Sequence, residues 1–426
     1  MKEFRSDISG FYKLSFEERQ QKISKIVNLN QEEIKVLQNL GYFTTSQIDT
    51  LIENVIGSYQ LPFGLAFNFK INNKDYIIPM VIEEPSVIAA ASNAAKFARK
   101  HGGFHSENVK SVMISQIQIT QLHDVEIAKR NILENKDRIL KIANDQDPFL
   151  NELGGGAFDF EIRELDTRKG KMLILHLLVD VLDAMGANVV NTMAEAVSPY
   201  IEELSKGKIY LRIVSNLASH RIAKSKATFD KDLLGGDQVV EGILNAYEFA
   251  VADPYRATTH NKGIMNGIVA LTIATGNDTR AIEAGAHAYA ALKGQYSPLT
   301  KLQVDSDGNL VGEIEIPLAL GIIGGMTKIH PMARLALKIL NVKSANELSQ
   351  VAAALGLAQN VAALRALASE GIQKGHMTLH SRNIAKLAGV PDELIEKVAS
   401  KLVEDKKIRV DYAKEILQRI ENEKNL

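Results

Sequence analysis

The stretch DPYRATTHNKGIMNG, residues 253–267, crowds cationic and polar side chains just before an apolar run that favours a buried helix. Lys262 falls near the start of that helix, with Asn261 as its candidate cap, and a buried lysine is costly unless it is paired. Asp278, at the head of the next predicted helix, is the candidate partner. A structural ion pair is the alternative, but we favour a functional site because so many polar groups converge there. These polar residues are Arg256, His260, Asn261, Lys262 and Asn266.

Two histidines in KGHMTLH, His376 and His380, stand four residues apart and would share one face of a helix. The metal-binding pattern H-E-x-x-H fails because Met377 takes the place of the glutamate, and no third ligand is evident. We therefore predict no metal site. An acid or base role suits an imidazole, which titrates near neutral pH, and an ordinary surface or core histidine is the alternative.

Residues Glu83, Glu84, Pro85 and Ser86 stand where an Ala-rich helix is predicted to begin, with Pro85 at its first position. The free N–H groups and partial positive charge of a helix N-terminus suit an anionic ligand. Ordinary charge complementarity at a helix start explains the two glutamates equally well, and the pattern alone does not separate the two interpretations.

The segment DAMGAN, residues 183–188, lies between a predicted buried strand and a predicted helix. A strand, a glycine-bearing loop and a helix in this order can place a pyrophosphate on the helix N-terminus. The segment lacks the G-x-G-x-x-G fingerprint, so a Rossmann fold is not predicted. Other glycine-rich loops, at 153–159 and 321–328, are weak signals because most glycines simply make turns.

The composition indicates a globular protein of two or three domains, with 426 residues of which 46% are hydrophobic. Lys plus Arg number 50 and Asp plus Glu 51, so we expect no nucleic-acid partner and no membrane partner. Apolar runs such as 171–181 are too short to span a bilayer, the N-terminus has no apolar signal core, and we expect a cytoplasmic protein. The absence of cysteine excludes disulfides, thiolate metal sites and an acyl-cysteine intermediate.

Residues 111–217 show a strand–helix–strand–strand–helix–strand order that is typical of a ferredoxin-like domain. We treat this domain as an insertion into a larger one. The predicted strands are 111–122, 158–165, 172–181 and 208–217, and the predicted helices are 126–143 and 188–204.

The larger domain is predicted to be mainly helical and to comprise residues 1–110 and 218–374. Its first 60 residues favour helices, the first with a Ser15–Glu18 capping box and the third in SQIDTLIENVI, and a hairpin turned at Asn72–Asn73 follows. Its second part is expected to be helical apart from one hairpin at 306–309. With a small helical unit at 375–426, the fold class is α+β.

Several segments, taken in order, resemble the 3-hydroxy-3-methylglutaryl-CoA (HMG-CoA) reductase family in its class II, bacterial and archaeal, form. That class has Glu-Pro-Ser at the catalytic glutamate and no N-terminal membrane anchor, and the resemblance covers nearly the whole chain. The segments are 53–66, 83–92, 183–197, 253–267, 274–290 and 370–383.

The resemblance implies a role for each residue that matches a family motif. The implied catalytic residues are Glu84, Lys262, Asp278 and His376. Ser86 and Arg256 would hold the terminal carboxylate of the HMG group, and Asn266 would hydrogen-bond in the same pocket. The implied cofactor-binding residues are Asp147, which is linked with a preference for NADH over NADPH, and Asp183, Met185, Gly186 and Asn188 of the cofactor loop.

The implied reaction interconverts HMG-CoA and mevalonate plus CoA with two NAD(P)H, through mevaldyl-CoA and mevaldehyde. It needs a stabiliser for each oxyanion and protons for the oxygen and the departing thiolate. Lys262, held by Asp278, suits the first task; Glu84, kept protonated by desolvation, and His376 suit the others. No nucleophile is needed, which agrees with the missing cysteine.

The resemblance also implies a homodimer with shared active sites, which can assemble into a hexamer, and a C-terminal flap at 375–426 that closes over the substrates. Two other interpretations remain. A reductase of a related acyl-CoA would need a different carboxylate pocket, although Ser86 and Arg256 are both present. A non-catalytic CoA- or nucleotide-binding module would not need the four catalytic residues together.

Overall fold

The structure is a computed structural model that describes residues 8, 10–369 and 372–424, with the side chains of 372–379 and 423–424 outside the described part. The chain divides into two units, Met1–Pro62 and Phe63–Leu426. The first unit contains η1 (Phe11–Lys13), α1 (Phe16–Val27), α2 (Gln31–Gln38) and α3 (Thr45–Asp49).

The capping box predicted at the start of α1 is confirmed. The Ser15 hydroxyl accepts from the Glu18 amide at 3.2 Å, and the Glu18 carboxylate accepts from the Ser15 amide at 2.8 Å. The third helix is shorter than predicted, because after Asp49 the chain continues in turns and Asn54 adopts a φ of 58°. Phe16, Ile48 and Val55 form the small core of this unit.

The second unit contains a six-stranded sheet in the order β2-β1-β3-β8-β10-β9. The β1–β2 hairpin is confirmed, and Asn72 and Asn73 both adopt the positive φ that its two-residue turn requires. The expectation of helix between 218 and the second hairpin missed β8. Its buried face carries Ala223, Ser225 and Ala227 before Phe229, and the three small residues give little hydrophobic signal. The strands are β1 (Phe63–Ile71), β2 (Lys74–Val81), β3 (Phe104–Ser106), β8 (Ile222–Phe229), β9 (Thr300–Val304) and β10 (Leu310–Pro317).

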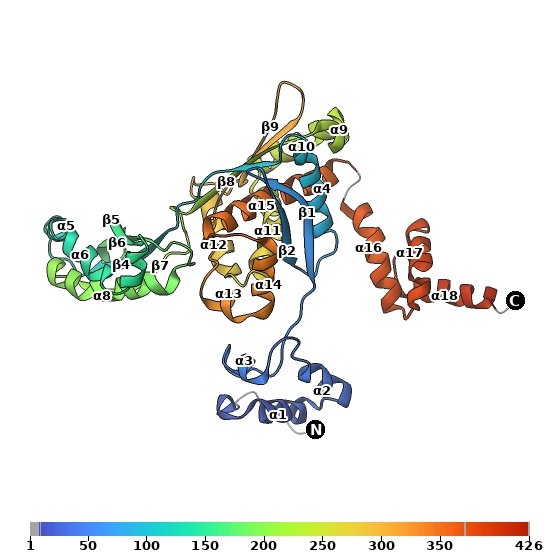
Figure 1. The fold of residues 1–426 in the computed structure, drawn as a ribbon, viewed down its shortest axis with the longest axis horizontal. Helices are drawn as coiled ribbons and strands as arrows, with labels where there is room; N and C mark the ends of the chain where they lie inside the picture. Colours follow the sequence, from blue (N-terminus) through green and yellow to red (C-terminus); the bar gives the residue numbers. More distant parts are fainter. Residues whose placement is uncertain (1–7, 9, 370–371, 425–426) are drawn as a thin grey trace. The chain divides into compact units, whose positions relative to one another are not determined.

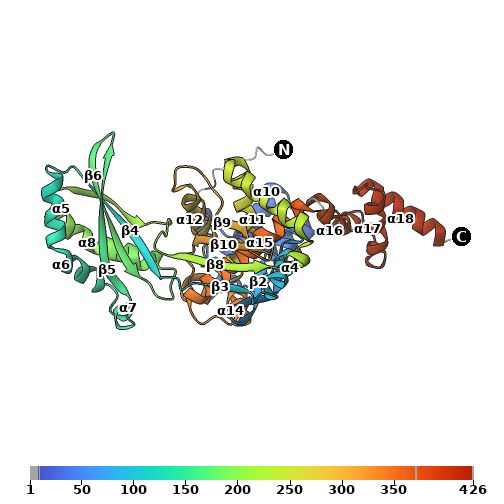
Figure 2. The same cartoon turned by 90° about the horizontal axis from the view of Figure 1, so that it is seen from above.

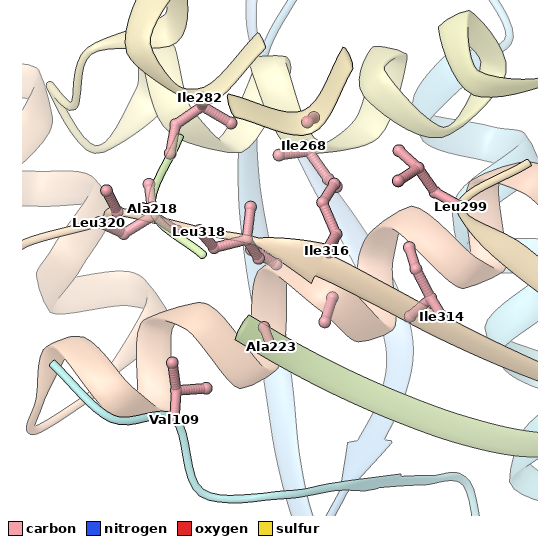
Figure 3. Close-up of a cluster of buried hydrophobic side chains, with 14 of the residues drawn as sticks. Val109, Ala218, Ala223, Ile268, Ile282, Leu299, Ile314, Ile316, Leu318 and Leu320 are labelled. Atoms are coloured by element: carbon pink, nitrogen blue, oxygen red, sulfur yellow. The ribbon is translucent and has the colours of Figure 1, made fainter. Parts of the chain in front are cut away.

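Helices pack against this sheet and against one another around a shared core. Figure 3 shows Ile316 of β10 close to Ile268 of α11, and both belong to this core. The helices are α4 (Val87–Arg99), α9 (Lys231–Leu234), α10 (Asp237–Ala252), α11 (Pro254–Ala274), α12 (Thr279–Ala291), α13 (Gly325–Ile329), α14 (Pro331–Leu340) and α15 (Ala345–Ala368).

The helices α11 and α15 approach closely because glycines line their contact. A Cβ atom at Gly267 would lie 3.2 Å from the Gln359 Cβ, and one at Gly356 would lie 2.8 Å from the Ile268 Cδ1. The helix α15 is long and apolar enough to cross a membrane by length and composition, but 67% of that window is buried inside the protein. It is therefore a core helix of this unit.

A second sheet, in the order β5-β6-β4-β7, is antiparallel throughout and has the strand order of a ferredoxin-like domain. Figures 1 and 2 both show it grouped with α5, α6 and α8. The single helix predicted over 126–143 is instead two helices that divide at Asn135. The elements are β4 (Val112–Thr120), α5 (Val125–Glu134), α6 (Lys136–Asn144), α7 (Pro148–Glu152), β5 (Gly156–Thr167), β6 (Gly170–Asp180), α8 (Ala187–Ser205) and β7 (Lys208–Val214).

The C-terminal segment is helical, as predicted, and has an apolar cluster of its own that includes Val398, Leu402 and Ala413. Its elements are α16 (Ile372–Leu387), η2 (Asp392–Leu394), α17 (Ile395–Glu404) and α18 (Val410–Lys424). The predicted α+β fold is confirmed, and the ferredoxin-like domain is inserted between elements of the second unit. Residues 1–62, predicted as part of the larger domain, form a unit of their own.

Candidate active site

A cleft of about 800 Å³ opens between the start of α4, one side of α11 and the second half of α15. These helices pack against one another, so residues far apart in the sequence line one space. The cleft brings together the sequence-predicted residues Glu84, Ser86, Arg256, Lys262 and Asn266.

The ammonium of Lys262 lies 3.3 Å from the Glu84 carboxylate. The side chains are 61% and 35% exposed, respectively, so the prediction of a buried lysine is wrong. The reason is the start of the helix: Asp253, not Asn261, caps α11, and Lys262 lies on the side of the helix that faces the cleft. Asn261 is buried instead, where its amide donates to the Ser297 carbonyl at 2.9 Å and accepts from the Leu299 amide at 3.0 Å.

Ser86 is the residue before the first turn of α4 and has a φ of 75°, which is rare for a residue with a side chain. The sequence had indicated that Pro85 occupies the first helical position. In the structure Pro85 instead precedes the cap residue. The Ser86 side chain makes no capping hydrogen bond, so its hydroxyl is available to a ligand in the cleft.

Arg256 supplies a cation to the same cleft. Its guanidinium forms no ion pair within the described residues, and partial burial lowers its pKa from the ordinary value. A half-buried cation without a counter-ion is a favourable place for a ligand carboxylate, which would supply the missing charge.

Asp278 does not pair with Lys262 in the described part of the chain, contrary to the interpretation drawn from the sequence. It caps α12, accepting from the backbone amides of Arg280 and Ala281 at 2.9 and 3.2 Å. Its second oxygen lies 3.2 Å from the Arg280 guanidinium. The capping position and Arg280 together account for this arrangement, and Glu84 is the carboxylate that pairs with Lys262.

A buried polar chain behind the cleft was missed by sequence reasoning. The His260 Nε2 lies 2.7 Å from the Thr300 Oγ1, which donates to the Asn360 Oδ1 at 3.0 Å, and Asn360 donates back to the His260 carbonyl at 3.4 Å. We assign the proton of His260 to Nε2 because the Thr300 hydrogen is already used. Burial first, and Arg256 second, lower the pKa of His260 to about 3, so the imidazole is neutral. Only His260 carried a sequence signal, because Thr300 and Asn360 lie in segments without a motif.

His376 lies in α16, but its side chain is outside the described part of the chain. His380, four residues later, is exposed. Among the residues that the structure describes, no group of three His, Cys, Asp or Glu could hold a metal ion.

The cofactor loop predicted at 183–188 joins β6 to α8. Gly186 precedes the first turn of α8 with a φ of 99° and no side-chain cap, so the N–H groups of that turn are free for a ligand. A Cβ at Gly186 would lie 2.6 Å from the Val181 side chain, so glycine is required there. Asp183 accepts from the Ala345 amide at 2.7 Å, Met185 is partly buried, and Asn188 is exposed in the first turn of α8. This arrangement fits a pyrophosphate.

Asp147 lies in the same domain, at the start of α7. Its carboxylate accepts from the Leu150 amide at 3.0 Å and caps that helix. The carboxylate has a second oxygen that could accept from a ligand hydroxyl.

The family model described as hydroxymethylglutaryl-coenzyme A reductase matches residues 15–381. The chain belongs to this family. A 3-hydroxy-3-methylglutaryl-coenzyme A reductase from Archaeoglobus fulgidus is 60% identical over 415 residues, which cover 97% of this chain and 95% of that protein. A probable HMG-CoA reductase from Borreliella burgdorferi is 37% identical, with 98% of each chain covered.

Solved structures agree with the sequence relatives. The HMG-CoA reductase from Streptococcus pneumoniae has a TM-score of 0.76 and 38% identity, covering 97% of this chain and 99% of that one. A structure described as the class II enzyme of that organism bound to NADPH in open conformations has the same score and identity, with 96% and 100% covered. The class II resemblance is confirmed: the chain is an HMG-CoA reductase, an NAD(P)H-dependent oxidoreductase, and the two other interpretations are not favoured.

Proposed function

We propose that the Glu84–Lys262 pair is the centre at which this reductase acts on the thioester carbon of HMG-CoA and on the aldehyde that follows. The observation that carries the proposal is the 3.3 Å contact of Lys262 with Glu84, in one cleft with Ser86 and Arg256. The nicotinamide cofactor would supply the hydrides, and the protein supplies orientation, charge and protons.

Lys262 is the proposed oxyanion stabiliser. Its ammonium has three donors, and the pair with Glu84 leaves donors free for a substrate oxygen that takes on negative charge. Glu84, whose carboxyl group lies beside Lys262 in the same cleft, is the proposed general acid for that oxygen. Asp278 and His376 complete the proposed catalytic set, the latter as the acid for the CoA thiolate.

The proposed HMG pocket uses Arg256 and Ser86 for the terminal carboxylate. The Arg256 guanidinium, which has no ion pair within the described residues, supplies the charge; the Ser86 hydroxyl, which makes no capping bond, supplies a donor; and Asn266 lies in the same lining. The experiment is a kinetic assay that follows oxidation of the reduced cofactor with HMG-CoA and, separately, with acyl-CoA thioesters that lack the terminal carboxylate. Activity with HMG-CoA but not with the thioesters that lack the carboxylate supports the proposed pocket. Equal activity with the two kinds of substrate contradicts it.

Cofactor preference is proposed to depend on Asp147, with NADH preferred over NADPH. A carboxylate can accept from a free ribose hydroxyl but repels a 2′-phosphate. The change Asp147→Asn keeps an oxygen to cap α7 and removes the charge, so it should raise kcat/KM for NADPH relative to NADH. Asp145→Asn, nearby and exposed, is the control. A ratio that is unchanged in Asp147→Asn, or higher kcat/KM for NADPH in the parent protein, contradicts this role.

We further propose a homodimer with shared active sites that can assemble into a hexamer, in the cytoplasm. The class II resemblance supports this assembly. Sedimentation equilibrium tests it directly, and a monomer that is fully active would contradict it.

A further inference from the structure

Arg221 is a buried arginine that no part of the proposed mechanism uses. Its side chain is 1% exposed, and its guanidinium donates to the carbonyl oxygens of Ala184 at 3.1 Å and Met185 at 3.2 Å, and also to that of Leu320. It forms no ion pair within the described residues. Burial lowers the pKa of Arg221 to about 10, against the opposing effect of Asp180 and Asp183, so the group is charged at neutral pH.

The two terminal nitrogens of this buried cation are paired only with backbone carbonyls, and its Nε has no hydrogen-bond partner within the described residues, so it costs more than an apolar residue of the same size. Its position is informative, because both consecutive carbonyls belong to the cofactor loop. In a trans peptide the N–H points opposite to the C=O, and the structure has no cis peptide among the described residues. The amide N–H groups of Met185 and Gly186 therefore point away from Arg221.

The loop is also held by the segment 320–323. The Ile322 amide donates to the Asp183 carbonyl at 2.9 Å, and a Cβ at Gly321 would lie 2.5 Å from the Met185 nitrogen. Asn277, next to Asp278, makes two hydrogen bonds to the Gly321 backbone at 3.0 and 2.8 Å. Because Arg221 also donates to Leu320, it joins this segment to the loop.

We propose that Arg221 is a positioning residue for the cofactor: it fixes the orientation of the loop at 183–186 and places a permanent positive charge behind the anionic pyrophosphate at the start of α8. The proposal rests on the cofactor role of the loop given above. A purely structural staple, which would stabilise the fold without favouring any ligand, is the alternative.

The test compares binding of two ligands to the full-length protein without turnover. The Kd of NADH and NADPH is measured by fluorescence of the bound reduced nicotinamide, and the Kd of HMG-CoA by calorimetry. Arg221→Met should weaken binding of both reduced cofactors by about tenfold or more, the usual effect of losing hydrogen bonds to a charged group. HMG-CoA affinity should stay within about twofold, because none of the residues in its proposed pocket contacts Arg221.

Arg221→Lys keeps the charge but not the three-way donation, so it should give an intermediate cofactor Kd. If Arg221→Met does not fold, the cofactor Kd of Arg221→Lys is the deciding measurement. An unchanged cofactor Kd in Arg221→Lys overturns the proposal. The control is Arg168→Met, an exposed arginine in the β5–β6 turn of the same domain, which should change neither Kd. Equal weakening of cofactor and HMG-CoA in Arg221→Met would show a structural staple and also overturn the proposal.

A separate variant tests the loop itself. Asn188→Asp adds a negative charge at an exposed position in the first turn of α8, where an acidic residue does not disfavour the helix. Weaker cofactor binding supports the loop as the pyrophosphate site. Unchanged binding in Asn188→Asp overturns the loop assignment. Weaker binding there with no effect of Arg221→Met overturns the role of Arg221 alone.

Discussion

Glu84 and Lys262 are 178 residues apart in the sequence, and their charged groups lie 3.3 Å from each other in the lining of one cleft. The contact joins the approach to α4 with the side of α11. Because both side chains are partly exposed, the pair contributes little to the stability of the fold. Substitutions here should therefore affect activity far more than folding.

Lys262→Ala should leave a folded protein that has lost about 10²–10³ in kcat, which is typical of losing one preorganised oxyanion stabiliser. Steady-state assays measure the loss, and thermal unfolding checks that Tm is nearly unchanged. Lys293→Ala, at an exposed position after α12, is the control. Near-normal turnover in Lys262→Ala would refute the assignment.

The same assay applied to Asp278→Asn separates charge from capping. Asparagine is as good a helix cap as aspartate, so α12 should keep its first turn. A loss of activity in a protein of normal stability would then report the negative charge. Full activity would leave Asp278 as a helix cap with no catalytic part.

The two halves of the reaction can be separated with free mevaldehyde, which needs one hydride and releases no thiolate. His376→Gln should lower the rate with HMG-CoA much more than the rate with mevaldehyde. Glu84→Gln should lower both, with about 10²–10⁴ at stake for a general acid. Equal losses on both substrates in His376→Gln would contradict a role for His376 in protonating CoA.

Motifs with local spacing were predictable from the sequence, and contacts between distant segments were not. The strand order of the inserted domain followed from the alternation of elements, and Lys262 and Glu84 each stood in a recognisable motif. Their mutual pairing was not foreseen, because Asp278 was nearer in sequence and equally acidic. Whether Asn261 caps a helix depends on where that helix begins, and Asp253 begins it two turns earlier.

Residues that lie outside any motif could not be predicted from the sequence, for a different reason. Thr300, Asn360 and Arg221 can be recognised as important only because they are buried. The sequence around them would look the same if their side chains were exposed. β8 was missed because three of the four residues on its buried face, Ala223, Ser225 and Ala227, are small and only Phe229 is large. Burial and tertiary partners are set by the whole fold, so local propensity does not reveal them.

The buried imidazole of His260 should make stability depend on pH below neutrality. Its folded-state pKa is about 3, against 6.5 for a free histidine, so below pH 6.5 the unfolded chain binds a proton that the folded protein does not. Stability is unaffected by this group above pH 6.5 and falls as the pH drops, by about 1.4 kcal/mol per pH unit.

Denaturant unfolding at pH 7 and pH 5, at one protein concentration, measures the effect. The parent protein should lose about 2 kcal/mol more between these pH values than His260→Gln, which does not titrate. The comparison of slopes removes any constant change in stability that the substitution causes. Identical pH dependence in the two proteins would show that His260 is not buried as a neutral group.

Residues 375–426, which contain the C-terminal helices, are proposed to act as a flap that closes over the bound substrate and cofactor and opens between the two hydride steps so that the cofactor can exchange. Oxidised cofactor must leave while the intermediate stays, and an open site would admit water around the reacting charges. The apolar cluster of α16, α17 and α18 is built from their own side chains, so truncation after Ser369 leaves the main core intact. The truncated protein should still bind HMG-CoA, as measured by calorimetry, but should barely turn over.

In the full chain, hydrogen exchange over 375–426 should slow only when HMG-CoA and oxidised cofactor are both bound. His376→Gln, which keeps the helices, is the control and should retain that slowing. Full activity after truncation, or exchange that is unchanged by the two ligands, would reject the flap.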